Sequence, residues 1–174
     1  MNFCPQCAAP VVQRVPPGDD RPRHVCEACG AVHYSNPKVV AGCLPVWQDR
    51  VLLCRRAIEP RTGFWTIPAG YLEMGESTEA GARREAYEEA RAEIEITGLL
   101  AVYNVVRIGQ VQILYRARLL TPEVEAGPET AELDLFGWPA VPWGELAFPT
   151  VHWVLRRAQE LRGHDGDFPP ALGP

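Results

Sequence analysis

The 174-residue sequence predicts an α/β fold in which a mixed β-sheet lies between helices, preceded by a small separate unit. Strand-like segments follow one another between residues 39 and 138, and one helix-forming segment lies among them. An amphipathic helix follows the last strand. The first 34 residues contain two Cys-x2-Cys pairs and bury too little to fold without a metal. We therefore expect a cysteine-rich unit at 1–34, a main domain at 35–162 and a flexible tail at 163–174.

The cysteine-rich unit has the ligand spacing of a tetrahedral metal site. Its pairs are Cys4-Pro-Gln-Cys7 and Cys26-Glu-Ala-Cys29, separated by 18 residues. The arrangement resembles a zinc ribbon, in which four cysteine sulfurs hold Zn²⁺ and leave no open position, so this metal would be structural. The alternatives are an iron centre of the rubredoxin kind and cysteines that are only small buried residues.

The strands are predicted from runs of β-branched and apolar residues between turn signals. Cys43 and Cys54 lie within two of these runs, and we expect both to pack in the core. A short helical turn is expected at 142–148, before the amphipathic helix at 150–161. The segments predicted as strands are 11–15, 23–25, 39–47, 51–57, 64–68, 93–106, 110–120 and 131–138.

Three arginines lie close together in the sequence before residue 70. Arg55 and Arg56 close one predicted strand, and Arg61 follows in a Pro/Gly loop. Two interpretations stay open for them, bidentate recognition of a diphosphate and ordinary surface charge.

Residues 70–92 combine a glycine-containing loop with an acidic helix. Ser77 and Thr78 are good N-cap residues, and Glu79 puts negative charge in the first turn, so a helix is expected to run to about Ala90. Alanines at every fourth position would let this helix lie close to a sheet.

Three glutamates of this helix, Glu85, Glu88 and Glu89, share an arc of about 100° because they are spaced i, i+3 and i+4. Carboxylates on one face repel each other unless a cation lies among them. The alternative is a solvated acidic face in which Arg84 pairs with Glu88 one turn later.

The spacing of the whole stretch is more specific than the glutamates alone. Gly70, five residues, Glu76, seven residues and then Arg84-Glu85-Ala86-Tyr87-Glu88-Glu89 resemble the signature of the Nudix hydrolases. These enzymes cleave nucleoside diphosphates linked to another moiety. The resemblance implies an α/β/α sandwich in which the signature forms a loop and helix beside the sheet.

The signature is not complete. Its last glycine is Arg91 here, and its two bulky aliphatic positions are Ala86 and Ala92. Glycine ends such a helix in the left-handed conformation, where arginine costs about 1 kcal/mol more. We therefore expect the helix to end differently, in a turn fixed by the next strand.

By this resemblance the helix holds a catalytic Mg²⁺ or Mn²⁺. Glu85 and Glu89 would be direct ligands, Glu88 a further or water-mediated one, and the Ala69 carbonyl would complete the shell. Arg84 would orient the glutamates.

The resemblance also assigns roles around the metal. Glu76, and Glu73 with it, would brace the loop. Apart from the resemblance, Gly70, Arg55 and Arg56 are our candidates for binding the substrate. Glu132 and Glu129 are the candidates for the base that activates water, and we favour Glu132.

Further segments resemble one branch of the family, the zinc-ribbon proteins that include plant FAD and ADP-ribose pyrophosphatases. The segments that carry this resemblance, besides the ribbon, are 34–40, 65–73 and 143–148. The motif of the zinc-ribbon NADH pyrophosphatases is absent, and Val106 stands where ADP-ribose hydrolases have a proline. We therefore rank FAD first, ADP-ribose second and NADH third, with AMP and FMN as the products from FAD. A homodimer is implied by the family.

Two other functions stay open. One is a Nudix hydrolase acting on NADH, a nucleoside triphosphate or a capped RNA. The other is a non-catalytic Nudix module that senses a nucleotide. Intact glutamates at the metal positions favour turnover.

The composition limits the classes of binding partner that we expect. The net charge of −5 argues against nonspecific binding to nucleic acid, which needs clustered Lys and Arg. The sequence has neither an apolar run long enough to span a membrane nor the apolar core of a signal peptide within its first 20 residues. We expect a cytoplasmic protein that binds a small nucleotide and whose cysteines are not paired as disulfides.

Overall fold

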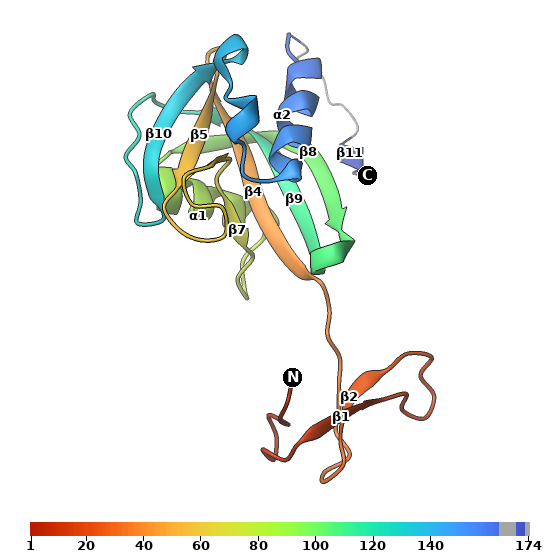
Figure 1. The fold of residues 1–174 in the computed structure, drawn as a ribbon. Coiled ribbons are helices and arrows are strands. Elements are labelled where there is room, and N and C mark those ends of the chain that lie inside the picture. Colours follow the sequence, from red (N-terminus) through yellow and green to blue (C-terminus); the bar gives the residue numbers. More distant parts are fainter. Residues whose placement is uncertain (164–169, 173–174) are drawn as a thin grey trace. The chain divides into compact units, whose positions relative to one another are not determined.

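The computed structural model describes residues 1–163 and 170–172, and Figure 1 traces them. The chain divides into two compact units, Met1–Pro37 and Lys38–Pro174. Most of the tail predicted at 163–174 lies outside the described residues. Within it, Ala171–Leu172 (β11) pair in parallel with residues 101–102 of a long strand. None of the described helices has both the length and the apolar composition to cross a membrane.

The first unit is a three-stranded antiparallel sheet. It consists of β1 (Val11–Arg14), β2 (Arg23–Cys26) and β3 (Val32–His33). The first two strands lie where the sequence predicts them. The third was not predicted, because two residues are too few to show an alternating pattern.

The second unit is built on an eight-stranded sheet whose main path is β10-β5-β4-β9-β8-β11. Strands β4 and β9 pair in parallel, whereas β4–β5, β5–β10 and β8–β9 are antiparallel, so the predicted mixed sheet is confirmed. The bounds of the long strands are β4 Lys38–Trp47, β5 Arg50–Arg56, β8 Ile94–Val105, β9 Gln110–Leu119 and β10 Thr130–Gly137. Three 3-10 turns complete the unit, η1 (Val106–Ile108), η2 (Trp138–Ala140) and η3 (Trp143–Glu145), of which only the last was predicted.

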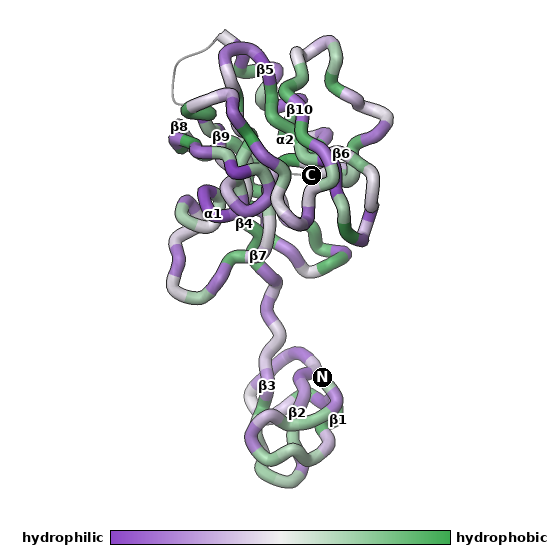
Figure 2. Tube along the Cα trace, turned by 90° about the vertical axis from the view of Figure 1, so that its left-hand side faces the viewer, coloured by the Kyte–Doolittle hydropathy of each residue, from purple (hydrophilic) through white to green (hydrophobic). Residues whose placement is uncertain are grey.

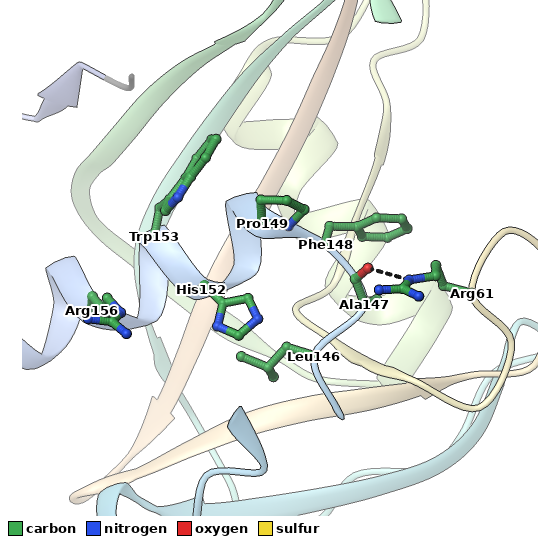
Figure 3. A pocket seen from close by; sticks show the side chains of 8 residues that line it. All are labelled: Arg61, Leu146, Ala147, Phe148, Pro149, His152, Trp153 and Arg156. Atoms are coloured by element: carbon green, nitrogen blue, oxygen red, sulfur yellow. Dashed lines mark hydrogen bonds between the residues drawn. The ribbon is translucent and has the colours of Figure 1, made fainter. Parts of the chain in front are cut away.

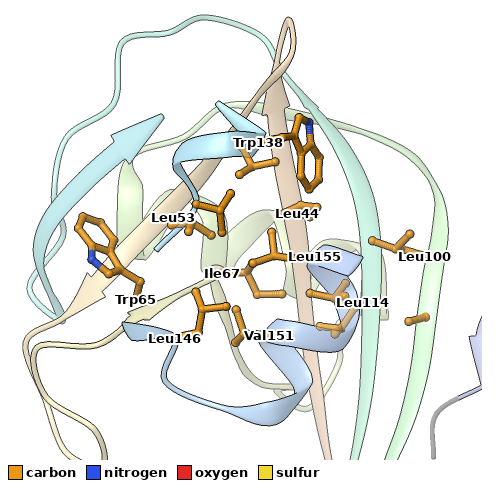
Figure 4. Close-up of a cluster of buried hydrophobic side chains, with 14 of the residues drawn as sticks. Leu44, Leu53, Trp65, Ile67, Leu100, Leu114, Trp138, Leu146, Val151 and Leu155 are labelled. Atoms are coloured by element: carbon orange, nitrogen blue, oxygen red, sulfur yellow. The ribbon is translucent and has the colours of Figure 1, made fainter. Parts of the chain in front are cut away.

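Helices cover the two faces of this sheet, which confirms the predicted α/β/α sandwich (Figure 1). Helix α1 (Thr78–Ala90) presents three fully buried alanines to one face. Helix α2 (Pro149–Glu160) packs its apolar side, with Val151 and Leu155, on the other face (Figure 4). Alanine allows the close approach of α1 because it has the smallest side chain beyond glycine.

Strand β5 contributes side chains to two hydrophobic cores, one on each face of the sheet. Neighbours such as Leu52 and Leu53 point to opposite faces, toward α1 and α2 respectively, because strand side chains alternate. Both are fully buried, and in Figure 2 the hydrophobic colour runs along β5. Covering both faces explains why this strand reads as a continuous apolar run.

The segment that begins the predicted glycine-containing loop is instead a strand, β7 (Ala69–Tyr71), paired with β4. A second short strand, β6 (Trp65–Thr66), pairs with β5, so direct pairing between β4 and β5 is confined to their hairpin end. A Cβ added at Gly42 of β4 would lie 2.4 Å from the Ala69 Cβ. Strand β7 forms through contacts with a segment that is distant in sequence, so no local pattern could predict it.

Helix α1 begins as predicted, with the Ser77 hydroxyl accepting the Ala80 N–H at 3.1 Å. The expectation of a different helix end was wrong. Arg91 itself adopts the left-handed conformation (φ 49°, ψ 25°), and its N–H donates to the Tyr87 carbonyl at 2.8 Å. This is the bond of an αL cap, so Arg91 replaces glycine without changing the geometry.

Because an L-residue is strained in this conformation, Arg91→Gly should raise the free energy of unfolding by about 1 kcal/mol. The side chain of Arg91 also contacts Tyr87, so Arg91→Ala is the matched control that removes this contact and keeps the strain. Urea denaturation measures both variants. Equal stabilities of the glycine and alanine variants would contradict the strain argument.

Candidate active site

The four cysteines of the first unit form one cluster. All four Sγ atoms lie within 4.8 Å of one another, with Cys4 and Cys29 at 3.7 Å and Cys7 and Cys26 at 3.5 Å. Zn–S bonds of about 2.3 Å in a tetrahedron put sulfurs roughly 3.8 Å apart. In the part of the chain that the structure describes, this is the only set of three or more His, Cys, Asp or Glu residues that close.

Two backbone loops of the same form present these sulfurs. The Cys4 carbonyl accepts the Ala8 N–H at 2.8 Å, and the Cys26 carbonyl accepts the Gly30 N–H at 2.9 Å. Ala8 (φ 59°) and Gly30 (φ 75°) occupy the same left-handed position of each loop. The repeated geometry fits a metal site better than cysteines that are only small core residues.

The protonation of the cluster also favours a bound cation. The Cys29 N–H lowers the pKa of Cys26 to about 7. The Ala9 N–H lowers the pKa of Cys7, but the sulfurs of Cys26 and Cys29 outweigh it and raise that pKa to about 12. Ionisation of one thiol thus disfavours ionisation of its neighbours, and a divalent cation among the sulfurs would remove this effect.

We expect the purified protein to hold about one zinc ion per chain, and Cys7→Ser to lose it. Cys43→Ala is the matched control, because Cys43 is buried in the second unit, outside the cluster. Metal analysis by mass spectrometry measures both. A full zinc content in Cys7→Ser, or iron in place of zinc, would contradict this assignment.

In the second unit, α1 turns two of its glutamates inward and one outward. Glu85 and Glu89 are only 8% and 9% exposed, whereas the side chain of Glu88 is 54% exposed. The Glu85 carboxylate lies directly over Gly70 of β7, where an added Cβ would be 2.3 Å from Oε1. Gly70 therefore serves by having no side chain, and it brings the backbone of β7 against the carboxylates.

The pKa values of both inward carboxylates are raised. Burial, and then the charge of Glu85, raise the pKa of Glu89 to about 8, although the Ala69 N–H and the charge of Arg56 oppose the rise. Burial also raises the pKa of Glu85. Two buried carboxylates short of positive charge fit a hard divalent cation, whose preferred ligands are oxygens.

Arg84 joins the loop before α1 to the helix. Its Nε and Nη2 donate to the two oxygens of Glu76, at 3.1 and 2.8 Å, and Nη2 also donates to the Tyr71 carbonyl at 3.1 Å. The same Glu76 accepts the Glu73 N–H at 2.8 Å. The loop is thus fixed by one carboxylate and one guanidinium.

The other end of Arg84 reaches the inner glutamates. Its Nη1 donates to Glu85 Oε1 at 2.7 Å and to Glu88 Oε2 at 3.0 Å. The contact with Glu88 is the one expected for a solvated acidic face, but the contact with buried Glu85 is not. Pairing with Glu76 first, and with Glu85 next, raises the pKa of Arg84 further above its ordinary value.

The two arginines at the end of β5 make different contacts. Arg55 donates to Glu132 Oε2 at 2.9 Å and to the Gly63 carbonyl, so it is occupied by an ion pair. Arg56 donates to the Pro60 carbonyl at 2.8 Å and forms no ion pair with a described carboxylate. Its charge lowers the pKa of Glu89, against the larger effects of burial and of Glu85.

The two candidate bases, Glu132 and Glu129, also lie in different environments. Glu132 is the ion-pair partner of Arg55, whereas the charge of Glu129 raises the pKa of both Glu85 and Glu89. The Glu129 carbonyl accepts the Ala57 N–H at 2.8 Å, which fixes its backbone.

The sequence did not predict two residues around this site. Gly127 donates its N–H to the Glu89 carbonyl at 3.0 Å, and an added Cβ would lie 1.8 Å from the Glu88 carbonyl oxygen. Cys54, expected only to pack in the core, makes a side-chain contact with Glu89. A glycine in a long polar loop was the only sequence signal for the first, and nothing local indicated the second.

Comparison with known proteins gives the same family throughout. The family model described as "NUDIX domain" matches residues 36–158, and "Nudix N-terminal" matches residues 2–35. The crystal structure of a Nudix hydrolase from Nitrosomonas europaea is 47% identical, with a TM-score of 0.94 over 99% of this chain and 98% of that chain.

Two curated relatives carry names that specify a substrate. The NAD-capped RNA hydrolase NudC of Chromobacterium violaceum is 32% identical over 161 residues, which are 90% of this chain and 58% of that protein. The ADP-ribose pyrophosphatase of Methanocaldococcus jannaschii is 28% identical over 119 residues, 66% of this chain and 69% of that protein. The chain thus spans only part of the length of these relatives.

Proposed function

The chain belongs to the Nudix hydrolase family, and from that membership we propose that it is a metal-dependent pyrophosphohydrolase of adenine dinucleotide-type substrates. Hydrolysis would break the diphosphate and release AMP and a second phosphorylated fragment. The observation that carries the proposal is the pair of buried carboxylates, Glu85 and Glu89, held against the backbone of β7.

We propose Mg²⁺ or Mn²⁺ as the catalytic cation, with Glu85 and Glu89 as its direct protein ligands. Glu88, which is exposed and bound to Arg84, would act through water, and the Ala69 carbonyl would complete the set. When bound, such a cation neutralises diphosphate charge and lowers the pKa of water. The cysteine cluster would hold Zn²⁺ without an open position and so has a structural role.

The residues of the chain itself position the reaction. Arg84 keeps the carboxylate of Glu85 turned inward by a 2.7 Å hydrogen bond. The charge of Arg56 acts on Glu89, and Arg56 forms no ion pair with a carboxylate in the described part of the chain, so it can bind the diphosphate. Arg55 is less suited to this role because it would first have to release Glu132.

We propose Glu129, rather than Glu132, as the base that takes a proton from the attacking water. Glu129 lies close enough to Glu85 and Glu89 for its charge to act on both. The carboxylate of Glu132 is already engaged in an ion pair with Arg55.

The names of the relatives point to ADP-ribose and NAD-type molecules, and we place these ahead of FAD, which the resemblance of the sequence had favoured. All three contain an AMP unit joined through a diphosphate. A homodimer remains part of the proposal on the basis of family membership.

The proposal is tested by a hydrolysis panel of ADP-ribose, NADH, NAD⁺, FAD and nucleoside triphosphates with Mg²⁺ or Mn²⁺. We expect AMP from at least one dinucleotide, and a decrease in kcat of about 100-fold or more in Glu89→Gln, because several kcal/mol of charge stabilisation depend on the cation. Glu79→Gln, on the exposed first turn of the same helix, is the matched control. If no compound is hydrolysed while a nucleotide raises the melting temperature, the chain is a sensor and not an enzyme.

The choice of base makes a separate prediction. Glu129→Gln should decrease kcat by about 10²-fold or more, because general-base catalysis contributes at least that much. Glu132→Gln should change kcat by less than about threefold. Steady-state kinetics on the best substrate measure both variants, and the reverse order of effects would establish Glu132 as the base.

A further inference from the structure

A pocket of about 540 Å³ opens at the N-terminal turn of α2, apart from the carboxylates of α1 (Figure 3). Aromatic side chains from the helix and the segment before it line the pocket, namely Phe148, His152 and Trp153. Arg61, from the loop after β5, and Arg156 bring positive charge to the two sides. No aspartate or glutamate is among the residues that line this pocket.

The charges of these two arginines are not compensated by any described carboxylate. Arg61 donates its Nε to the Ala147 carbonyl at 3.0 Å and lies over the Phe64 ring at 4.4 Å. Arg156 lies over the Trp143 ring at 5.7 Å. In each case an aromatic face or a carbonyl holds the guanidinium in place, and further N–H groups stay available.

The chain carries a net charge of −5, so acidic side chains outnumber basic ones. Some of its arginines have carboxylate partners within reach, as in the pairs Arg55–Glu132, Arg118–Glu95 and Arg162–Asp49, whereas others, such as Arg56, do not. Two unpaired guanidinium groups at one pocket, in a chain rich in acidic residues, indicate a site for an anion.

The conformation of Arg61 supports the same conclusion. Its φ of 67° lies in the left-handed region, where a side chain other than glycine is strained. The loop nevertheless holds it there, with the Glu59 carboxylate accepting the backbone N–H of Arg61 at 3.0 Å and leaving its guanidinium free of that carboxylate. Strain of this kind accumulates where a side chain must point in one direction for a function.

Arg56 connects the pocket with the carboxylates. Its guanidinium lies 5.3 Å from the centre of the Phe148 ring, which lines the pocket, and its charge also acts on Glu89. A substrate whose diphosphate lies at Arg56 can therefore place one of its two moieties among the aromatic side chains.

We propose that this pocket binds the adenosine moiety of the substrate, on one side of the scissile diphosphate, and selects an adenosine that carries its own phosphomonoester. The adenine ring would lie against Phe148, His152 and Trp153, and the phosphomonoester would bind Arg61 or Arg156, which lie at opposite ends of the pocket. Trp153 is braced for this role by an edge-to-face contact with Tyr103 at 5.3 Å. The proposal rests on the proposed function for the position of the diphosphate, but its test does not require turnover.

The test uses pairs of dinucleotides that differ by one phosphomonoester, NADPH with NADH and coenzyme A with dephospho-coenzyme A. The first pair differs at a ribose 2′ position and the second at a 3′ position, so the two arms show which isomer the pocket accepts. Dissociation constants are measured by calorimetry with Mg²⁺ on Glu89→Gln, in which hydrolysis is suppressed.

We expect the phosphorylated member of at least one pair to bind about tenfold or more tightly, because a hydrogen bond between charged groups is stronger than one between neutral groups. At least one of the added substitutions Arg61→Gln and Arg156→Gln should bring that ratio close to one, and both should leave the binding of the unphosphorylated member within about twofold. Arg107→Gln removes an exposed positive charge from the β8–β9 turn and is the matched control.

Equal binding of the two members in both pairs would overturn the proposal, and so would a ratio that survives both arginine substitutions. A phosphate preference that depends on these arginines in a chain that hydrolyses nothing would support the pocket and contradict the proposed function. The two proposals can therefore fail separately.

Discussion

Burying two carboxylates side by side on one helix is the constraint on which the active unit depends. Burial raises the pKa of both Glu85 and Glu89, so the surrounding chain has to supply positive charge or N–H groups. Arg84 reaches Glu85, and the backbone of β7 approaches both because Gly70 has no side chain. The arrangement leaves a deficit of positive charge that a divalent cation can fill, and this is why the site suits an anionic diphosphate.

The cysteine unit solves a similar problem with backbone groups. Two loops of the same form turn N–H groups toward their sulfurs, and they place four thiols where only a cation allows all of them to ionise together. In the first unit the like charges come from cysteine pairs distant in sequence, and in the second from glutamates one helical turn apart. In both units short loops around these groups fix their positions.

Local patterns predicted much of this structure, and contacts between distant segments account for the rest. Capping by Ser77 and the spacing of the glutamates predicted α1, and alternation predicted the long strands. Nothing local indicated that Gly127 would lie against the Glu88 carbonyl, or that Cys54 would contact Glu89. The helix end at Arg91 was wrongly predicted because the strain of one residue, about 1 kcal/mol, is smaller than the gain from the packing around it.

The central claim is that Glu85 and Glu89 together hold the catalytic cation. Anomalous diffraction from crystals soaked in Mn²⁺ tests it most directly, because manganese can be located without assuming its ligands. The account predicts a manganese peak bound by the carboxylates of Glu85 and Glu89, next to the backbone of Ala69, which is lost in the Glu85→Gln, Glu89→Gln double variant. Manganese that binds elsewhere in the second unit, or that persists in the double variant, would contradict it.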